Sequence, residues 1–197
     1  MNFLAHLYLS CEEEELMIGN FIADSVKGRA FLNFSAGIRR GILLHRAIDH
    51  FTDQHSVTRT SVSRLRPAYG KYSGVIIDIF YDHFLAAGWS RFSEQPLADF
   101  SSSVQAVLVR YRPIMPLRSQ QFLEYMIRKN IPMPYATLQG IEEVLYGMSR
   151  RAKFENRMYA AVKELNAHYR DFGLEFELFF PELCRFAEQK KSELAKQ

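Results

Sequence analysis

The stretch GILLHRAIDHFTDQH, residues 41–55, combines apolar residues at helical spacing with several histidines and aspartates. The apolar spacing predicts a helix over residues 36–54. On this helix His45, Asp49 and Asp53 follow one another at intervals of four residues, which aligns their side chains along one stripe. An ionised aspartate in a partly buried helix is costly unless it is paired or bound to a metal. The stretch therefore predicts both a helix and a candidate site on one of its faces.

A purely structural interpretation of the same stretch stays open. His45 is compatible with a core histidine bonded to a carboxylate, and Asp53 with a residue near the helix end. His50 and His55 are compatible with solvated side chains. Polar groups in apolar settings serve structure as well as function, so the stretch alone does not decide.

Helical spacing of apolar residues extends along almost the whole chain, and alternating strand-like runs are scarce. No internal repeat, low-complexity tract or change to linker-like composition interrupts it. We expect an all-α fold, a single-domain helical bundle over residues 1–197. Helices are expected near residues 2–9, 12–29, 36–54, 57–66, 73–88, 97–112, 118–130, 135–148, 152–171 and 180–195.

Composition narrows the class of protein. A chain of 197 residues with 48% hydrophobic content can bury one substantial core, and no apolar run approaches the ~20 residues of a membrane span. The N-terminal NFLAHLYLS is short and runs into four glutamates, so we expect no signal peptide, no membrane partner and a cytoplasmic protein. The net charge of +3 is too mild to predict nucleic-acid binding. Two distant cysteines indicate neither a disulfide framework nor a thiolate metal site.

A second polar cluster lies in GVIIDIFYDHFLAAGW, residues 74–89. Asp78 and Asp82 are four residues apart on an otherwise apolar helix, and His83 follows. Two carboxylates on one face of such a helix repel each other and lose hydration, and a bound cation would relieve both penalties. The alternative is that each carboxylate pairs with an arginine, such as Arg39, Arg40 or Arg46.

Two further segments contribute candidates near the N-terminus. IGNFIADSVKGR, residues 18–29, carries Asp24 as a candidate ligand and Lys27 as a candidate contact to a substrate phosphate. An ordinary surface pair between these two residues is the alternative. His6, within an apolar helical segment, fits either a satisfied core histidine or a ligand.

Histidine and aspartate from several helices, without cysteine, form the donor mixture that suits Mn²⁺, Fe²⁺, Mg²⁺ or Zn²⁺ with open positions. Such a centre activates water and screens the charge of a phosphate ester, which favours phosphoester hydrolysis. The HExxH, P-loop, GxGxxG and GxSxG motifs are absent from the sequence, so it offers no support for the chemistries that they carry.

Four segments in order, NFLAHLYLS, GNFIADSVKG, GILLHRAIDHFTDQH and SGVIIDIFYDHFLAAGW, resemble the acyl carrier protein phosphodiesterase family, which belongs loosely with the HD-type metal phosphohydrolases. The resemblance implies an HD-like helical bundle and a metal-dependent hydrolase, with Mn²⁺ as the expected ion and Fe²⁺ or Mg²⁺ as alternatives. The implied reaction cleaves the phosphodiester between 4′-phosphopantetheine and a serine of holo-acyl carrier protein. Its products are apo-acyl carrier protein and 4′-phosphopantetheine.

The polar residues that match this family's segments are His6, Asp24, His45, Asp49, Asp78, Asp82 and His83. The chain departs from the HD pattern because it contains no His-Asp dipeptide, only Asp49-His50 and Asp82-His83 in the reverse order. The ligand set is therefore inferred from helix faces. We expect Asp24, His45, Asp49 and Asp82 as ligands, with Asp78, His6 and His83 in or around the ligand sphere.

Expected catalytic roles follow from that ligand set. We expect Asp24, Asp49 and Asp82 to act in catalysis, with His83 or an unliganded aspartate accepting a proton. The expected phosphate contacts are Lys27 and Arg46.

The resemblance also implies an acidic partner, the acyl carrier protein, and hence a basic surface at the mouth of the site. The basic residues beside the motif helices are Arg39, Arg40, Arg59, Arg64, Arg66 and Lys71, and ordinary solvated arginines are the alternative. Two competing functions stay open at this stage. One is an HD-like phosphohydrolase acting on a nucleotide or another small phosphate ester, and the other is a helical binding protein without the chemistry. The sequence does not indicate the oligomeric state.

Overall fold

The helix expected over residues 36–54 forms as α3, Ala36–Gln54, in the computed structural model, which describes residues 3–196. It begins after Ser35, whose hydroxyl oxygen accepts a hydrogen bond from the backbone N–H of Ile38 at 3.4 Å. This N-cap satisfies one of the backbone donors that a helix start leaves open. It ends at His55, which is extended (φ −66°, ψ 131°).

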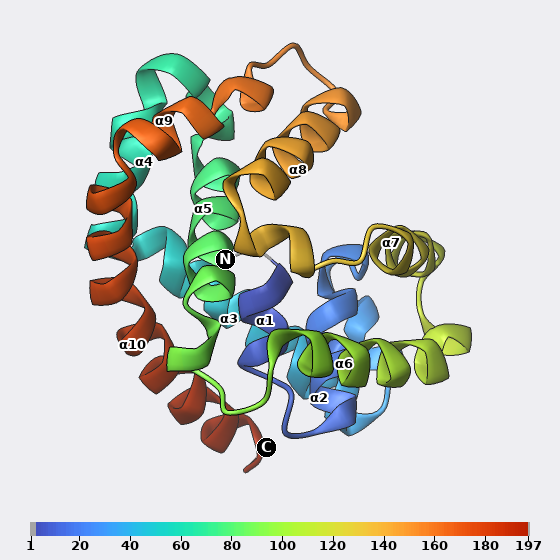
Figure 1. Cartoon of the computed structure of the whole chain (residues 1–197). Helices are drawn as coiled ribbons and strands as arrows, with labels where there is room; N and C mark the ends of the chain where they lie inside the picture. Colours follow the sequence, from blue (N-terminus) through green and yellow to red (C-terminus); the bar gives the residue numbers. More distant parts are fainter. Residues whose placement is uncertain (1–2, 197) are drawn as a thin grey trace.

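The described part of the chain is built from helices joined by short connections and contains no strand, which confirms the all-α prediction (Figure 1). Besides α3, its α-helices are α1 (Phe3–Tyr8), α2 (Glu14–Ile22), α4 (Ser56–Tyr69), α5 (Ser73–Ala87), α6 (Leu97–Tyr111), α7 (Leu117–Arg128), α8 (Leu138–Arg151), α9 (Val162–Ala167) and α10 (Tyr169–Leu194). Short 3₁₀ turns, η1 to η7, lie at Ala23–Ser25, Ala30–Asn33, Gly70–Tyr72, Trp89–Arg91, Arg112–Ile114, Met133–Ala136 and Met158–Ala160.

Helices α2 and α3 pack against each other through two glycines. A Cβ on Gly19 would lie 2.0 Å from the carbonyl oxygen of Ile38, and one on Gly41 would lie 2.0 Å from that of Leu16. Only glycine allows the two backbones this close approach. The contact fixes the register between α2 and α3, and with it the relative positions of the polar residues that each helix carries.

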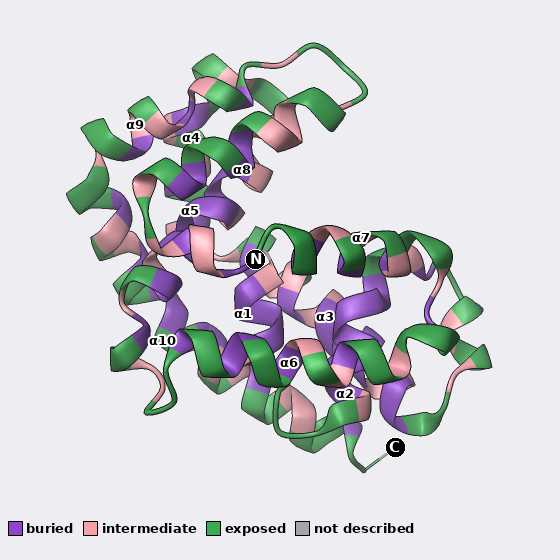
Figure 2. Cartoon of the chain, turned by 45° about the vertical axis from the view of Figure 1, so that its right-hand side comes forward, coloured by how far each residue is buried: buried purple, intermediate pink, exposed green. Residues whose placement is uncertain are grey.

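Helix α5 runs through the interior, in contact with α1, α4, α8 and α10 (Figure 1). Residues on all its sides are buried, including Ile76, Phe80, Tyr81 and Leu85. A helix that is apolar all round belongs inside a larger protein. In Figure 2 the buried colour likewise follows the inward faces of the helices, and the outer faces are exposed.

The segment expected as one helix over residues 12–29 is shorter. Helix α2 ends at Ile22, the turn η1 follows, and Val26 is extended (φ −107°, ψ 102°). Gly28 then adopts φ +52°, a conformation that glycine accepts without strain. This break places Asp24 in a turn beside α3 instead of on a continuous helix.

The C-terminal part also differs from expectation. Residues 152–171 do not form one helix, because α9 covers only Val162–Ala167 and α10 starts at Tyr169. Helix α10 then continues through Gly173 and Pro181, since its buried stripe of Phe172, Phe176, Phe180 and Leu183 keeps helical spacing across both. Gly173 marks close packing and not a break, because a Cβ there would lie 3.3 Å from the ring of Phe84.

The buried apolar residues come from helices along the whole described chain and form one continuous core. In residues 3–196 no helix combines the length and apolar character that crossing a membrane requires.

Candidate metal centre

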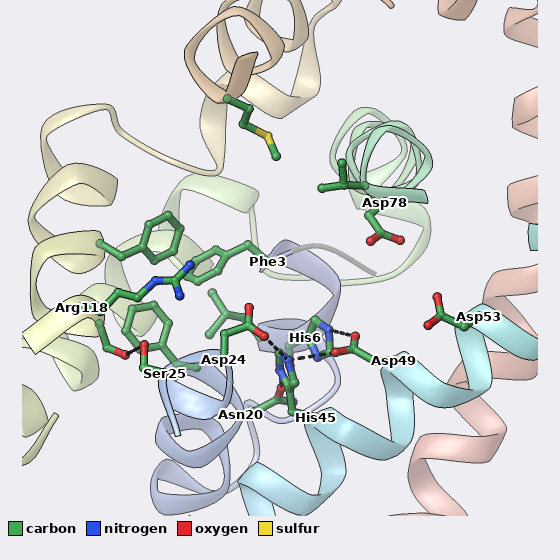
Figure 3. Close-up of a pocket in the computed structure, with 16 residues that line it drawn as sticks. Phe3, His6, Asn20, Asp24, Ser25, His45, Asp49, Asp53, Asp78 and Arg118 are labelled. Atoms are coloured by element: carbon green, nitrogen blue, oxygen red, sulfur yellow. Dashed lines mark hydrogen bonds and ion pairs between the residues drawn. The ribbon is translucent and has the colours of Figure 1, made fainter. Parts of the chain in front are cut away.

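Three side chains from α1 and α3 converge at the base of a cavity (Figure 3). His6 lies on α1, and His45 and Asp49 lie one turn apart on α3. Each offers a donor atom within 4.8 Å of the other two. The Asp49 carboxylate bridges the histidines, with Oδ1 at 3.1 Å from Nε2 of His6 and Oδ2 at 3.1 Å from Nε2 of His45.

The two imidazoles are stacked, with ring centroids 4.0 Å apart and an angle of 20° between their planes. Burial and the nearby His45 lower the pKa of His6, so it is neutral near pH 7. Burial opposes the charged form of His45 too, but hydrogen bonds to Asp24 and Asp49 outweigh it and raise its pKa to about 9. Hydrogen bonds from both histidines lower the pKa of Asp49 against the effect of burial. In this structure a protonated His45 thus supplies the positive charge that the carboxylates require.

Asn20 on α2 orients both histidines. Its Nδ2 donates to the carbonyl oxygen of His6 at 3.0 Å, so its Oδ1 faces Nδ1 of His45, also at 3.0 Å. An amide oxygen only accepts, and therefore Nδ1 of His45 carries a hydrogen and Nε2 points to the cavity. Asn20 is 1% exposed. The sequence patterns did not identify Asn20 as a site residue, although a single amide side chain on an apolar helix could have indicated one.

Asp24 reaches the cluster from η1. Its Oδ1 lies 3.4 Å from Nε2 of His45, and its side chain is 81% exposed. The hydrogen bond from His45 lowers the pKa of this carboxyl against partial desolvation. Within the described chain Lys27 makes no ion pair with Asp24, so the surface-pair alternative is not what the structure shows.

The cluster opens into a cavity of about 560 Å³ with walls from α1, α2, α3, α5, α7 and α8. Its volume falls in the ordinary range for small-ligand sites, roughly 300–1,000 Å³. Three aromatic rings form one wall, with centroids 5.2 Å apart for Phe3 and Phe21 and 4.9 Å apart for Phe3 and Phe122. The cavity therefore combines a polar base with an apolar side.

Asp53 and Asp78 also line this cavity but lie farther from the histidines (Figure 3). Asp53 is exposed near the end of α3. Asp78 projects from α5, and burial raises its pKa. Arg40 pairs with Glu13, and Arg46 donates to backbone carbonyl oxygens, so the arginine pairing considered for this helix is not seen for either arginine.

Asp82 does not join the cluster, which corrects the expected ligand set. Its carboxylate is fully buried and accepts hydrogen bonds from the backbone N–H groups of Leu4, at 2.7 Å, and Ala5, at 3.2 Å. Burial raises its pKa to about 7, although these two bonds favour the carboxylate. Helix α5 is turned so that Asp82 meets the N-terminus of α1, a position that holds α1 and thereby His6.

His83 likewise points away from the cavity. Its Nδ1 pairs with the carbonyl oxygen of Tyr135 at 2.8 Å, and its Nε2 lies 3.0 Å from the hydroxyl of Tyr169. Burial lowers its pKa. His83 follows Asp82 on the helix and so faces another side, where its neighbours give it a role in packing and not the expected role of proton acceptor.

The two expected phosphate contacts are also placed elsewhere. Arg46 donates to the carbonyl oxygens of Val26 at 2.9 Å and Gly28 at 3.1 Å, which fastens the loop after η1 to α3. Lys27 is exposed. Neither Lys27, on the loop, nor Arg46, on α3, is among the residues that line the cavity.

The donor set at the cavity base fits a divalent cation. It offers two imidazole nitrogens and a carboxylate, with Asp24 adjacent, and this mixture suits Mn²⁺, Fe²⁺ or Zn²⁺. Nδ1 of His6 is buried without a hydrogen-bond partner among the described residues, so the site leaves one polar nitrogen unsatisfied. These observations are compatible with a divalent metal.

Comparison with known proteins adds to this geometry. A family model described as acyl carrier protein phosphodiesterase matches residues 1–183. The chain belongs to the acyl carrier protein phosphodiesterase family. This confirms the resemblance of its four ordered segments.

Curated relatives in this family match almost the whole chain, and each is named acyl carrier protein phosphodiesterase. The Photorhabdus laumondii protein is 30% identical over 191 residues, 96% of either chain. The Klebsiella pneumoniae protein is 30% identical over 192 residues, 97% of this chain and 100% of its own. The Shigella boydii protein is 31% identical over 191 residues, 96% of this chain and 99% of its own. No solved structure matches the chain. The HD-like label stays a prediction.

Proposed function

We propose that this chain is a metal-dependent hydrolase that cleaves the phosphodiester joining 4′-phosphopantetheine to a serine of holo-acyl carrier protein. The observation that supports it most is the convergence of His6, His45 and Asp49 at the base of a cavity of about 560 Å³. Family membership favours this substrate over a nucleotide or another small phosphate ester. The products are apo-acyl carrier protein and free 4′-phosphopantetheine.

His6, His45 and Asp49 are the proposed metal ligands, and Asp24 is the candidate for a fourth position. Mn²⁺ is the proposed ion, with Fe²⁺ and Mg²⁺ as alternatives, since imidazole nitrogens suit Fe²⁺ and carboxylate oxygens suit Mn²⁺ and Mg²⁺. A bound divalent cation supplies Lewis acidity and screens the negative charge of the phosphodiester. His45 must lose its proton to serve as a ligand, and Asn20 keeps its Nε2 directed to the site.

As the alternative to ligation by Asp24, Asp24 and Asp78 are proposed as the proton-transferring pair. The pKa of Asp24 is lowered by its hydrogen bond from His45, so this carboxylate is ionised and can accept a proton from the attacking water. Burial raises the pKa of Asp78, which favours the protonated form that can give a proton to the leaving serine oxygen. Two carboxyl groups whose pKa values diverge within one cavity suit an acid and a base.

The apolar wall of Phe3, Phe21 and Phe122 is proposed to accommodate the aliphatic pantetheine arm. Aromatic rings bury such a chain without competing for its polar ends, and they exclude water from one side of the reacting phosphate.

Incubation of the Mn²⁺-loaded protein with holo-acyl carrier protein, followed by mass spectrometry of the carrier, tests the proposal. We expect the carrier to lose the mass of phosphopantetheine, and excess chelator to abolish that loss. His45→Gln should be inactive, whereas His50→Gln, an exposed histidine on the same helix, should retain activity.

Two results would contradict the proposal. An unchanged carrier mass together with hydrolysis of nucleotides or other small esters would exclude the carrier protein as the substrate. Activity that survives complete removal of divalent metal would exclude the metal-dependent mechanism.

A further inference from the structure

The side of the cavity away from the triad is formed partly by α7, a segment outside the sequence motifs. Arg118, Ser119 and Phe122 of this helix line the cavity together with Ser25 of η1. Figure 3 shows Arg118 and Ser25 on the side opposite Asp49 and Asp78, with the guanidinium directed into the cavity near Phe3. A ligand that binds between the two sides therefore meets the carboxylates and imidazoles on one side and Arg118 on the other.

Arg118 is the single lysine or arginine among the described residues that line this cavity. Among residues 3–196 no carboxylate lies within ion-pair distance of its guanidinium. Neighbouring Arg112 is different, because it pairs with Glu124 on α7. The donors of Arg118 are thus available to a ligand, and a guanidinium matches the oxygens of a phosphate in two-point geometry.

Ser25 adds a neutral donor beside Arg118. The hydroxyl of Ser119 donates to the hydroxyl oxygen of Ser25 at 2.8 Å. Ser25 accepts that bond and so keeps its own hydrogen to donate into the cavity. Ser119 is buried and belongs to α7, and the bond therefore holds η1 and α7 at a fixed separation.

Charge balance in the cavity supports an anion on this side. Asp24, Asp49, Asp53 and Asp78 contribute carboxyl groups to the cavity, and those that are ionised repel a phosphodiester anion. A cation at the triad would offset this repulsion from one side only. Arg118 is placed to offset it from the other.

We propose that Arg118, assisted by the hydroxyl of Ser25, binds the non-bridging oxygens of the substrate's phosphodiester. The inference rests on the proposed function and gives these residues the phosphate contact that the sequence assigned to Lys27 and Arg46. They make no bond to the reacting phosphorus, and their contribution is binding and orientation of the anion.

Isothermal titration calorimetry of the metal-loaded protein with inorganic phosphate tests this assignment without requiring turnover. Arg118→Gln should weaken phosphate binding by about 10- to 100-fold, the usual effect of losing a charge-assisted hydrogen-bonding partner. Arg118→Lys should recover part of the loss because it restores the charge without the two-point geometry. Arg128→Gln, at the other end of α7, should bind phosphate as the wild type does. Metal affinity should be the same in all four proteins.

Phosphate binding by Arg118→Gln at the wild-type affinity would overturn the inference, and so would a wild-type protein that binds no phosphate at millimolar concentration. Turnover of holo-acyl carrier protein by the wild type is measured in parallel. If phosphate binding depends on Arg118 but the carrier is not hydrolysed, the anion site stands and the proposed substrate fails. If the carrier is hydrolysed equally by wild type and Arg118→Gln, the anion site fails and the proposed function stands.

Discussion

His45 illustrates how single residues set the properties of this site. Its Nδ1 is hydrogen-bonded to Asn20, and its Nε2 lies close to the carboxylates of Asp24 and Asp49. The pKa of about 9 that results means that the metal-free protein carries a proton where a metal ligand is needed. Metal and proton therefore compete for the same nitrogen, and measurable consequences follow.

Metal binding should release about one proton per ion at pH 7, because His45 is protonated in the metal-free state and must be neutral as a ligand. The apparent affinity for Mn²⁺ should rise by up to about tenfold per pH unit until the pH reaches the pKa of His45. Calorimetric titrations in buffers of different ionisation enthalpy measure the released protons. A heat of binding that does not vary with the buffer would contradict this account.

The stability of the metal-free protein should fall as the pH rises, whereas its affinity for metal should increase. Folding raises the pKa of His45 from 6.5 to about 9, so its stabilising contribution is complete below pH 6.5 and is lost as the pH rises through about 9. We expect the free energy of unfolding to fall by at most about 3 kcal/mol over this interval, as measured by urea denaturation in chelator. His45→Gln should lack this part of the pH dependence. Equal pH dependence in the two proteins would show that His45 is not the group responsible.

Asn20→Ala should weaken metal binding by about 10- to 100-fold, the usual cost of losing a partner that orients a ligand. The substitution leaves Nδ1 of His45 and the carbonyl oxygen of His6 without their described partner. Asn33→Ala, an exposed asparagine in η2, is the matched control and should bind metal normally. Metal dissociation constants from competition with a chromophoric chelator decide the matter, and an unchanged value for Asn20→Ala would refute the orienting role.

At the scale of elements, the close approach of α2 and α3 brings Asn20 and Asp24 to the face of α3 that carries His45. Gly41→Ala should destabilise the protein by at least about 2 kcal/mol, since the added Cβ would meet the carbonyl oxygen of Leu16 at 2.0 Å. Gly74→Ala on α5 is the control, because nothing lies within 4 Å of the position that a Cβ would take there. It should be neutral or slightly stabilising in urea denaturation. Similar stabilities for the two variants would mean that the helices are not in this contact.

Asp82 fixes the position of helix α1 by accepting hydrogen bonds from its first turn. Asp82→Ala leaves the backbone N–H groups of Leu4 and Ala5 without their buried acceptor, which should cost about 2–4 kcal/mol of the free energy of unfolding. Metal affinity should fall as well, because His6 follows directly on this helix. Asp99→Ala, an exposed aspartate in the first turn of α6, should change stability by no more than about 0.5 kcal/mol. A fully stable Asp82→Ala variant would argue against this anchoring role.

Sequence periodicity predicted where helices lie better than which neighbour each side chain faces. The bounds of α3 follow from its apolar spacing, and its stripe of His45 and Asp49 does point into a cavity. Asp82 has the same spacing from Asp78, but the packing of α5 turns it toward the start of α1. Spacing within one helix carries no information about its rotation against the others, and this explains the error.

For the whole molecule, the all-α class and the family follow from the sequence, whereas the contacts between distant segments do not. Arg118 had no distinguishing local signal, because its importance comes from α7 lying across the cavity from α3. The arginines expected at a docking surface show the same limit. Arg40 pairs with Glu13, and Arg64 pairs with Glu175. These two cations are engaged within the protein, so the surface charge left for a partner is smaller than their number in the sequence suggests.

Global stability should report metal binding because the cluster joins α1 to α3. A ligand that binds only the folded state stabilises it by about 2.7 kcal/mol at a concentration 100 times its dissociation constant. We therefore expect Mn²⁺ to raise the unfolding midpoint of the wild type and of His50→Gln but not that of His45→Gln. An equal shift in all three proteins would indicate binding somewhere other than the described cluster.

The central claim is that His6, His45 and Asp49 hold a divalent cation, and anomalous diffraction at the manganese edge from crystals grown with Mn²⁺ tests it most directly. The account predicts a strong anomalous peak within bonding distance of an imidazole nitrogen of each histidine and a carboxylate oxygen of Asp49. A fully ordered cluster without such a peak, or a peak bound by other residues, would contradict it.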